Sequence, residues 1–192
     1  MEIAQRLKEF KADLMSMDSN QVFRKYFIEQ PCFALDSEKQ RALKTKISEM
    51  FNVNYTDVYI MGSAKLGFSI AAKKRYRAFG DYSDIDIAII SPHIFESYWK
   101  ENVLYLYENP LIGYEIKNSF SKYVAQRGWI RPDFFVSPEL KNNWTEKFRV
   151  ITASQQYGPY KITAGIYYDF MFLEKYQLQC IEQCKGELKN GN

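Results

Sequence analysis

The feature that most constrains the fold is an alternation of aspartate and isoleucine, Asp84-Ile85-Asp86-Ile87, which continues as an apolar run to Ile90. Side chains of a β-strand point alternately to the two faces of a sheet, so the segment predicts a strand with both carboxylates on one face. Two carboxylates about 4 Å apart repel each other by about 1 kcal/mol even in water, and by more beside a buried strand. A fold that keeps this pair therefore needs a cation to compensate it.

A second apolar run, Val58 to Met61, predicts a strand that ends at the pair Gly62-Ser63. Glycine permits close approach of the backbone, and the N–H groups of such a turn, with the serine hydroxyl, can bind an anion. Lys65 and Gly67 extend the turn, and a lysine there would neutralise phosphate. The turn therefore predicts a binding site for a triphosphate.

The stretch between these strands, residues 64–83, contains Lys73, Lys74, Arg75 and Arg77, and we interpret it as an elaborated, partly mobile loop. Its basic side chains either steer a triphosphate, an RNA end or a partner protein, or simply form a solvated surface. The sequence leaves these alternatives open.

A third aspartate, Asp133, lies in a segment with strand character, Trp129 to Val136, in which Pro132 indicates an edge strand or a bulge. An unpaired carboxylate among apolar neighbours is costly, so this one too indicates a cation. If its strand lies beside the strand of Asp86, then Asp84, Asp86 and Asp133 would hold two metal ions about 3.5–4 Å apart. Two metal ions at that distance can bind the attacking and the leaving oxygen of a phosphoryl transfer.

The identity of the metal follows from the ligands. His93 is the only histidine, which weighs against a histidine-rich metal site and against a Ser-His-Asp triad. Mg²⁺ prefers oxygen ligands and completes its shell with water and substrate phosphates. We therefore expect two Mg²⁺ ions, with Mn²⁺ as a possible substitute.

The rest of the chain has helical periodicity. Apolar spacing, capping residues and breakers predict helices over residues 2–15, 19–30, 37–51, 95–107, 114–126, 138–154 and 163–189. These elements predict one α/β domain over residues 1–192, built on a small mixed sheet of the α+β-like kind. The catalytic core would span residues 53–137, with a helical extension over residues 1–52 and a C-terminal helical part over residues 138–192.

The combination of Gly62-Ser63, Asp84-x-Asp86 and Asp133 resembles the pattern of the DNA polymerase beta-like nucleotidyltransferase superfamily, especially its small bacterial members of the minimal nucleotidyltransferase type. The resemblance spans roughly residues 58–136. It implies that Gly62 and Ser63 bind the nucleotide phosphates, that Asp84 and Asp86 bind both metals, and that Asp133 holds the catalytic metal and helps to activate the acceptor hydroxyl. In this chain the interval between the Gly-Ser turn and the aspartate pair is longer than in the small members.

Two classes of function follow from the resemblance. The first is a magnesium-dependent nucleotidyltransferase that moves a nucleoside monophosphate from a nucleoside triphosphate to a hydroxyl acceptor, either an RNA end or a partner protein, within a toxin–antitoxin or phage-defence system. The alternative is a nucleotide-binding or partner-neutralising module with little or no turnover. A third hypothesis, an RNA-binding protein that uses the basic loop, predicts binding that depends on salt and ignores the aspartates.

The bulk properties set few limits. A net charge of +3 does not indicate a nucleic-acid binder, and the three cysteines lack metal-site spacing. No secretory signal and no bilayer-spanning stretch is evident, so we expect a cytoplasmic protein that acts away from membranes, with a protein partner or a second copy as possible associates.

Overall fold

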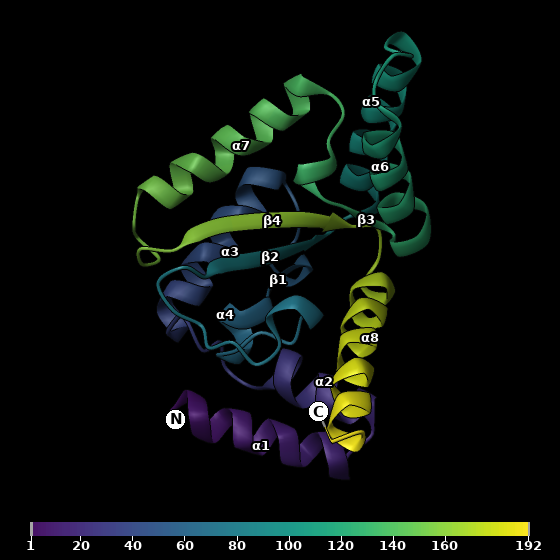
Figure 1. Ribbon diagram of the computed structural model, residues 1–192. Helices are drawn as coiled ribbons and strands as arrows, with labels where there is room; N and C mark the ends of the chain where they lie inside the picture. The colour runs from purple at the N-terminus through teal and green to yellow at the C-terminus, as the bar shows by residue number, and fades with distance from the viewer. Residues whose placement is uncertain (1, 192) are drawn as a thin grey trace.

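A computed structural model of the protein describes residues 2–191 and contains a mixed four-stranded sheet in the order β1-β2-β4-β3 (Figure 1). Strand β2 is antiparallel to β1 and parallel to β4, and β3 is antiparallel to β4 at the far edge. The architecture is the α/β class expected from the sequence. The strands are β1 (Val58–Met61), β2 (Asp84–Ile90), β3 (Trp129–Ile130) and β4 (Lys161–Tyr167).

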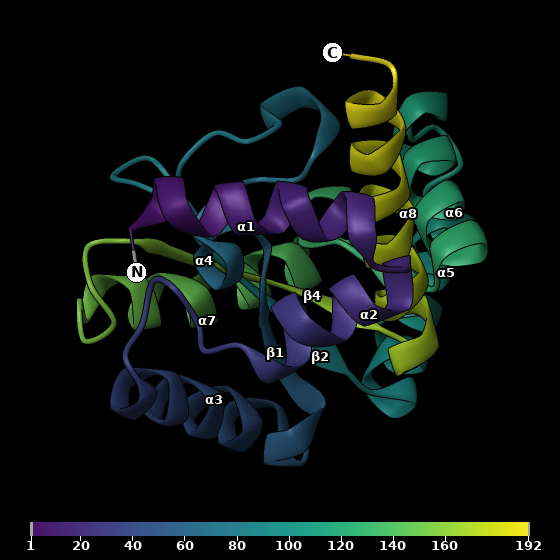
Figure 2. The same cartoon turned by 90° about the horizontal axis from the view of Figure 1, so that it is seen from below.

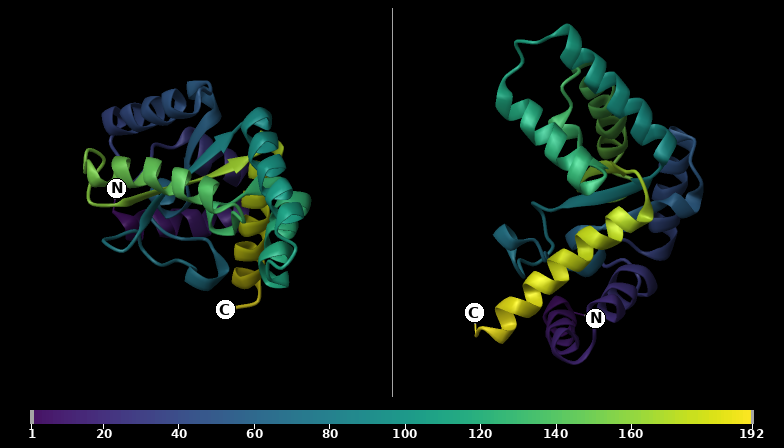
Figure 3. Two further views of the ribbon diagram at one scale, coloured as in Figure 1. Left: turned by 90° about the horizontal axis from the view of Figure 1, so that it is seen from above. Right: turned by 90° about the vertical axis from the view of Figure 1, so that its right-hand side faces the viewer.

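Helices cover both faces of this sheet. Figure 1 shows α7 on one side of the sheet and α1, α2 and α8 on the other, and Figure 2 shows α1 crossing beside α8. Helices α5 and α6 form a hairpin that extends beyond the sheet (Figure 3). The helices are α1 (Ile3–Ser16), α2 (Ser19–Phe23), α3 (Ser37–Phe51), α4 (Gly62–Leu66), α5 (Pro92–Glu108), α6 (Tyr114–Arg127), α7 (Pro138–Ala153) and α8 (Phe170–Lys189). A π-helix, η1 (Arg24–Glu29), continues α2, and 3-10 turns occupy η2 (Tyr55–Asp57), η3 (Ala72–Lys74) and η4 (Pro132–Phe134).

The alternation in β2 produces the predicted two-sided strand. Ile85, Ile87 and Ile89 are buried in a core that the sheet shares with α3, α5 and α7, whereas Asp84 and Asp86 are exposed on the opposite face. Further along that face the strand is covered by a second core, built from α1, α2, α8 and the segment after α4. The aspartates therefore lie where the apolar cover of this face ends.

The expected helix over residues 163–189 is wrong at its start, because residues 161–167 form β4 and α8 begins at Phe170. Ile162 and Ile166 are four residues apart, a spacing that suits one face of a helix and one face of a strand equally well. In the structure both are buried on the α7 side of the sheet, with Ala164 between them. The C-terminal part thus supplies a central strand as well as helices, since β4 lies between β2 and β3.

The expected strand over residues 129–136 is also shorter than predicted. Pairing stops at Ile130, and Pro132 begins the 3-10 turn η4. Proline has no N–H to donate to a ladder, which explains both the early end and the position of β3 at the edge of the sheet.

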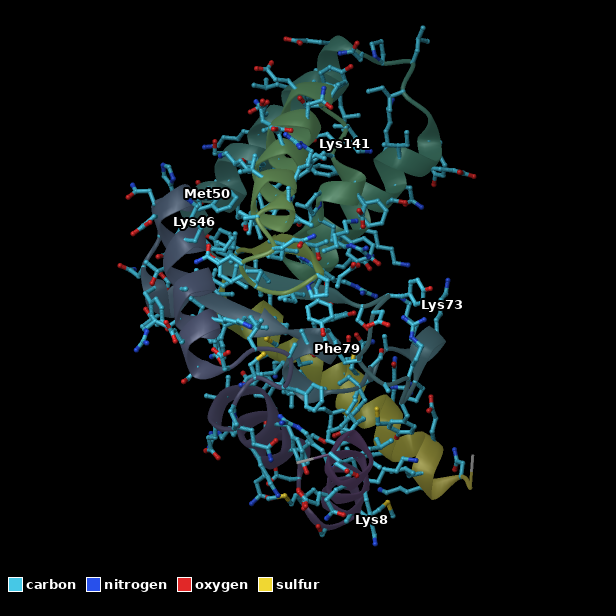
Figure 4. All side chains as sticks on the ribbon, turned by 90° about the vertical axis from the view of Figure 1, so that its left-hand side faces the viewer. Lys8, Lys46, Met50, Lys73, Phe79 and Lys141 are labelled. Carbon is cyan, nitrogen blue, oxygen red and sulfur yellow. The ribbon has the colours of Figure 1, made fainter. Side chains whose placement is uncertain are left out.

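The segment 67–83 is folded against the body of the protein. Ser69 N–H donates to the Arg77 carbonyl and Phe79 N–H to the Gly67 carbonyl, so the two arms of the segment run side by side. Arg75 forms two hydrogen bonds with the carboxylate of Glu187 on α8, at 2.7 and 2.9 Å. Figure 4 shows Lys73 at the outer end of this segment, whereas Phe79 lies near the middle of the molecule.

Among residues 2–191, no helix combines the length and the apolar character that crossing a membrane requires.

Candidate active site

The junction between β1 and α4 lies directly against the aspartate strand. Met61, the last residue of β1, is the register partner of Asp86, so the following residue, Gly62, turns over the Asp86 side chain. Gly62 has a φ of +62°, and a Cβ at this position would lie 2.6 Å from Asp86 Oδ2. Both facts favour glycine, because other residues seldom adopt this φ and a methyl group would overlap the carboxylate unless the carboxylate moved.

The next strand supplies a hydroxyl to the same carboxylate. Thr163 of β4 is the register partner of Asp86, and its Oγ1 donates a hydrogen bond of 3.0 Å to Asp86 Oδ1. Asp84 lies two residues before Asp86, on the same face of β2, and its register partner on β4 is Lys161. Two carboxylates and one hydroxyl therefore share the face of β2 and β4 where the turn at Gly62 meets it.

The surroundings of Asp86 raise the pKa of its carboxyl group. The principal cause is partial desolvation by the backbone and side chains packed around the carboxylate, although part of the residue remains exposed to solvent, and the charge of Asp84 adds to the effect. The hydrogen bond from Thr163 and the positive charges of Lys74 and Arg131 act in the opposite direction. The site thus holds a carboxylate pair that a cation would stabilise, with basic groups within electrostatic range.

Arg131 is held by aromatic rings beside the site. Its guanidinium carbon lies 5.1–5.3 Å from the ring centroids of Tyr123, Trp129 and Phe134, a geometry for cation–π attraction. Its Nη2 also pairs with Asp133 Oδ2 at 2.6 Å. The positive group is therefore fixed at the β3 edge of the site.

Asp133 is separated from the other two aspartates. It lies in η4 with its side chain 67% exposed, and β4 stands between β3 and β2. The condition for a three-carboxylate site, adjacent strands for Asp133 and Asp86, is not met. In the described part of the chain, no three acidic, histidine or cysteine side chains converge as a metal-binding group.

The other residues expected at the phosphate site have different positions. Ser63 is half-buried at the start of α4, next to Gly62. Lys65 is buried and its Nζ donates to the Gln30 carbonyl at 2.5 Å, on the side of α4 that faces the N-terminal helices. Gly67 ends α4 with a φ of +89°, and a Cβ there would lie 3.0 Å from the Phe33 ring. Gly67 thus has a structural role as the left-handed cap of the helix.

The two strand carboxylates fit Mg²⁺. In proteins this ion is usually held by one or two carboxylates, with water and substrate phosphates completing its shell, so a third protein carboxylate is not required. Asp84 and Asp86 project from the same face, and their surroundings raise the pKa of Asp86, so a cation beside the pair would stabilise its ionised form. The site therefore suits a metal that arrives with a phosphate ligand.

Two residues of this site were not assigned a role from the sequence. Thr163 was missed because its segment was predicted to be helical, and a helix would not have aligned it with Asp86. Arg131 was visible in the sequence beside Asp133, but only the ring positions of Tyr123 and Phe134 show how it is fixed. A test of residues 161–167 for strand alternation would have indicated Thr163.

The chain matches no protein-family model, no curated protein and no solved structure.

Proposed function

We propose that the protein is a magnesium-dependent nucleotidyltransferase that moves a nucleoside monophosphate from a nucleoside triphosphate to a hydroxyl acceptor. The observation that carries the proposal is the contact between the Gly62 turn and Asp86, because it places a glycine-serine turn and two strand carboxylates at one point. A turn of this kind suits phosphate oxygens, and the carboxylates suit the metal that accompanies them.

In this proposal Asp84 and Asp86 hold Mg²⁺, with Mn²⁺ as a substitute. The metal would supply charge neutralisation for the phosphates and for the leaving pyrophosphate. Thr163 keeps the Asp86 carboxylate oriented through its hydrogen bond. Asp133 would have to leave Arg131 before it could bind a metal, so the proposal depends on Asp84 and Asp86.

The positive side chains around the pair would bind the rest of the triphosphate. Arg131 is preorganised by its aromatic neighbours and can present a planar fork to phosphate oxygens. Lys74 is exposed on the segment after α4 and acts on Asp86 through its charge. Ser63, at the start of α4, offers a hydroxyl and its backbone N–H.

The acceptor is either an RNA end or a partner protein, as in the toxin–antitoxin and phage-defence systems that the motif resemblance suggests. The α5–α6 hairpin carries several exposed apolar side chains, which supports a protein partner because such side chains are commonly buried in protein interfaces. They are Trp99, Leu104, Tyr107, Leu111, Tyr114 and Ile116.

A second candidate function is a nucleotide-binding or partner-neutralising module without turnover. It is favoured by two observations: the position beside Asp86 on the neighbouring strand is a threonine, and Asp133 is paired with Arg131. With two carboxylates the site would bind a metal–nucleotide complex but would lack the third carboxylate that activates an acceptor hydroxyl.

The two candidates differ in label transfer. Purified protein is incubated with Mg²⁺, each α-³²P-labelled nucleoside triphosphate, total RNA and cell lysate, beside the double variant Asp84→Asn/Asp86→Asn. The enzyme transfers label to RNA or protein and the double variant does not. The binding module binds nucleotide in the presence of Mg²⁺, loses that binding in the double variant, and transfers no label in either form.

A further inference from the structure

A small cavity lies at the β1 edge of the sheet, between α4, η1 and α3. It has a volume of about 100 Å³ and is lined by residues from η1, α3, β1 and α4. A cavity of this size has room for a few water molecules or for one polar group of similar size. Its lining residues are Phe27, Ile28, Gln40, Lys44, Tyr59, Ile60 and Lys65.

Two lysines face this cavity, and no carboxylate lines it. Lys65 is 5% exposed, and a single hydrogen bond to the Gln30 carbonyl leaves two of its N–H donors for other partners. Lys44 is half-buried, with its Nζ 4.3 Å from the ring centroid of Tyr55. Neither lysine forms an ion pair with a carboxylate of residues 2–191.

A third cation adds to the positive charge behind the cavity. Arg6 is 5% exposed and its Nη2 donates to the carbonyls of Pro31 and Lys65 at 3.1 and 3.2 Å. Its Nε is buried without a hydrogen-bond partner. Burial lowers the pKa of both lysines; for Lys65 the nearby Cys32 acts in the opposite direction, and the charges of Arg6 and Lys44 lower the pKa further. Buried charges are normally paired, so this group of cations lacks an anion.

We infer that this cavity binds a small oxyanion of the phosphate class, held by the ammonium groups of Lys44 and Lys65. Gln40 and Tyr59 also line the cavity, and their side chains carry N–H and O–H donors of the kind that phosphate oxygens accept. The small volume selects inorganic phosphate or a single phosphoryl group. This site is distinct from the Asp86 site and does not depend on the function proposed for it.

The position of Lys65 gives the site a structural consequence. Lys65 lies three residues after Gly62 on the single helical turn of α4, so the same short element contributes to the cavity and to the turn over Asp86. An anion that neutralises Lys65 would stabilise α4, and with it the Gly62 turn.

Isothermal titration calorimetry with inorganic phosphate tests the inference, in EDTA so that no metal contributes. The wild type is compared with Lys44→Met and with Lys46→Met, a control on the same helix whose exposed side chain points to solvent (Figure 4). The double variant Asp84→Asn/Asp86→Asn removes the carboxylates of the other site. Lys44 is chosen because the buried Lys65 could be required for folding.

The wild type, Lys46→Met and the double aspartate variant should each bind one phosphate, and Lys44→Met should bind it at least about tenfold more weakly, the loss of one charged hydrogen bond. A second titration uses glycerol 3-phosphate to distinguish free phosphate from a phosphoryl group carried by a larger molecule. Glycerol 3-phosphate binds if the site accepts such phosphoryl groups, and it fails to bind if the cavity admits only the free ion. The inference is overturned if the wild type binds neither compound saturably. It is equally overturned if Lys44→Met binds as tightly as the wild type, or if the double aspartate variant loses binding.

Discussion

The Cα atom of Gly62 lies so close to Asp86 that a Cβ on Gly62 would be 2.6 Å from Asp86 Oδ2. This contact joins the end of β1 to the middle of the site, and it depends on a residue with a φ of +62°. Since the nearest atom is the end of the aspartate side chain, a larger residue at position 62 would push the carboxylate aside rather than prevent folding.

We therefore expect Gly62→Ala to reduce label transfer more than it reduces stability. The positive φ should cost about 1–2 kcal/mol of unfolding free energy. Displacement of the Asp86 carboxylate should lower the rate of transfer by about a hundredfold, as small misplacements of reacting groups do. Urea unfolding and initial rates measure the two effects.

The matched control is Gly80→Ala, in the same region of the chain. A Cβ at Gly80 meets nothing within 4 Å, and its φ is not positive. This variant should keep both stability and transfer close to the wild type. Equal losses in the two variants would show that the contact with Asp86 is not what matters at position 62.

Asp86→Asn should make the protein more stable at neutral pH. The folded state raises the pKa of Asp86 mainly through desolvation, so the ionised group costs stability above its folded pKa. Because Asp86 is partly exposed, solvent screens part of this penalty, and the gain should be at most about 1 kcal/mol, which would raise Tm by at most about 2–4 °C in a chain of this length. The asparagine oxygen can still accept the hydrogen bond from Thr163.

The stability advantage of Asp86→Asn should depend on pH, because it comes from the raised pKa of Asp86. As the pH falls through the raised pKa, wild-type Asp86 becomes neutral and loses its penalty, so the advantage of Asn over Asp should shrink and disappear in acid. Calorimetric melting between neutral pH and about pH 3 measures it. An advantage that stays constant over this range would mean that the charge of Asp86 is not its cause.

Thr163→Val should weaken metal binding, because it removes the hydroxyl that donates to Asp86 Oδ1 at 3.0 Å. Loss of a hydrogen bond to a metal-binding carboxylate typically costs about tenfold or more in affinity. The pKa of Asp86 should also rise further, which moves the onset of metal binding to higher pH. Mn²⁺ titration followed by electron paramagnetic resonance measures both effects. Thr163→Ser keeps the hydroxyl and should bind as the wild type does; if Val binds equally well, Thr163 has no part in positioning the carboxylate.

The local part of the site could be predicted from the sequence because it depends on neighbouring residues. In Asp84-Ile85-Asp86-Ile87 the polar and apolar residues alternate every two residues, a repeat that suits a strand and not a helix. The structure confirms that the two aspartates share a face. The helix predicted over residues 37–51 is likewise confirmed as α3, where the Asp36 side chain accepts a hydrogen bond from Lys39 N–H.

The non-local part could not be predicted, because strand order has no local signal. Ile162 and Ile166 suit a helix and a strand equally, so the segment that carries Thr163 was assigned to α8. With β4 missing from the predicted sheet, nothing excluded the condition on which a three-aspartate site rested, that the Asp133 segment lies beside β2. In the structure β4 fills that place, and Asp133 pairs with Arg131 at the edge instead.

An ion pair between Arg75 and Glu187 joins the segment 67–83 to the C-terminal helix. The Arg75 side chain is 10% exposed, and its guanidinium contacts Glu187, the Ile70 carbonyl and Cys184 Sγ. Glu187→Ala would leave this guanidinium nearly buried without a carboxylate, at a cost of about 1–3 kcal/mol.

We therefore expect Glu187→Ala to expose the segment to trypsin, which cleaves after lysine and arginine, while most of the fold remains intact. Lys73 and Lys74 lie in the segment and are exposed, so the open form would be cut there first. Glu187→Gln, which keeps hydrogen-bond acceptance without the charge, should have an intermediate rate. Because Lys74 is one of the cations that act on Asp86, the Ala variant should also lose nucleotide affinity as its cleavage rate rises. Cleavage at the wild-type rate in Glu187→Ala would show that the backbone hydrogen bonds at Ser69 and Phe79 hold the segment without help from α8.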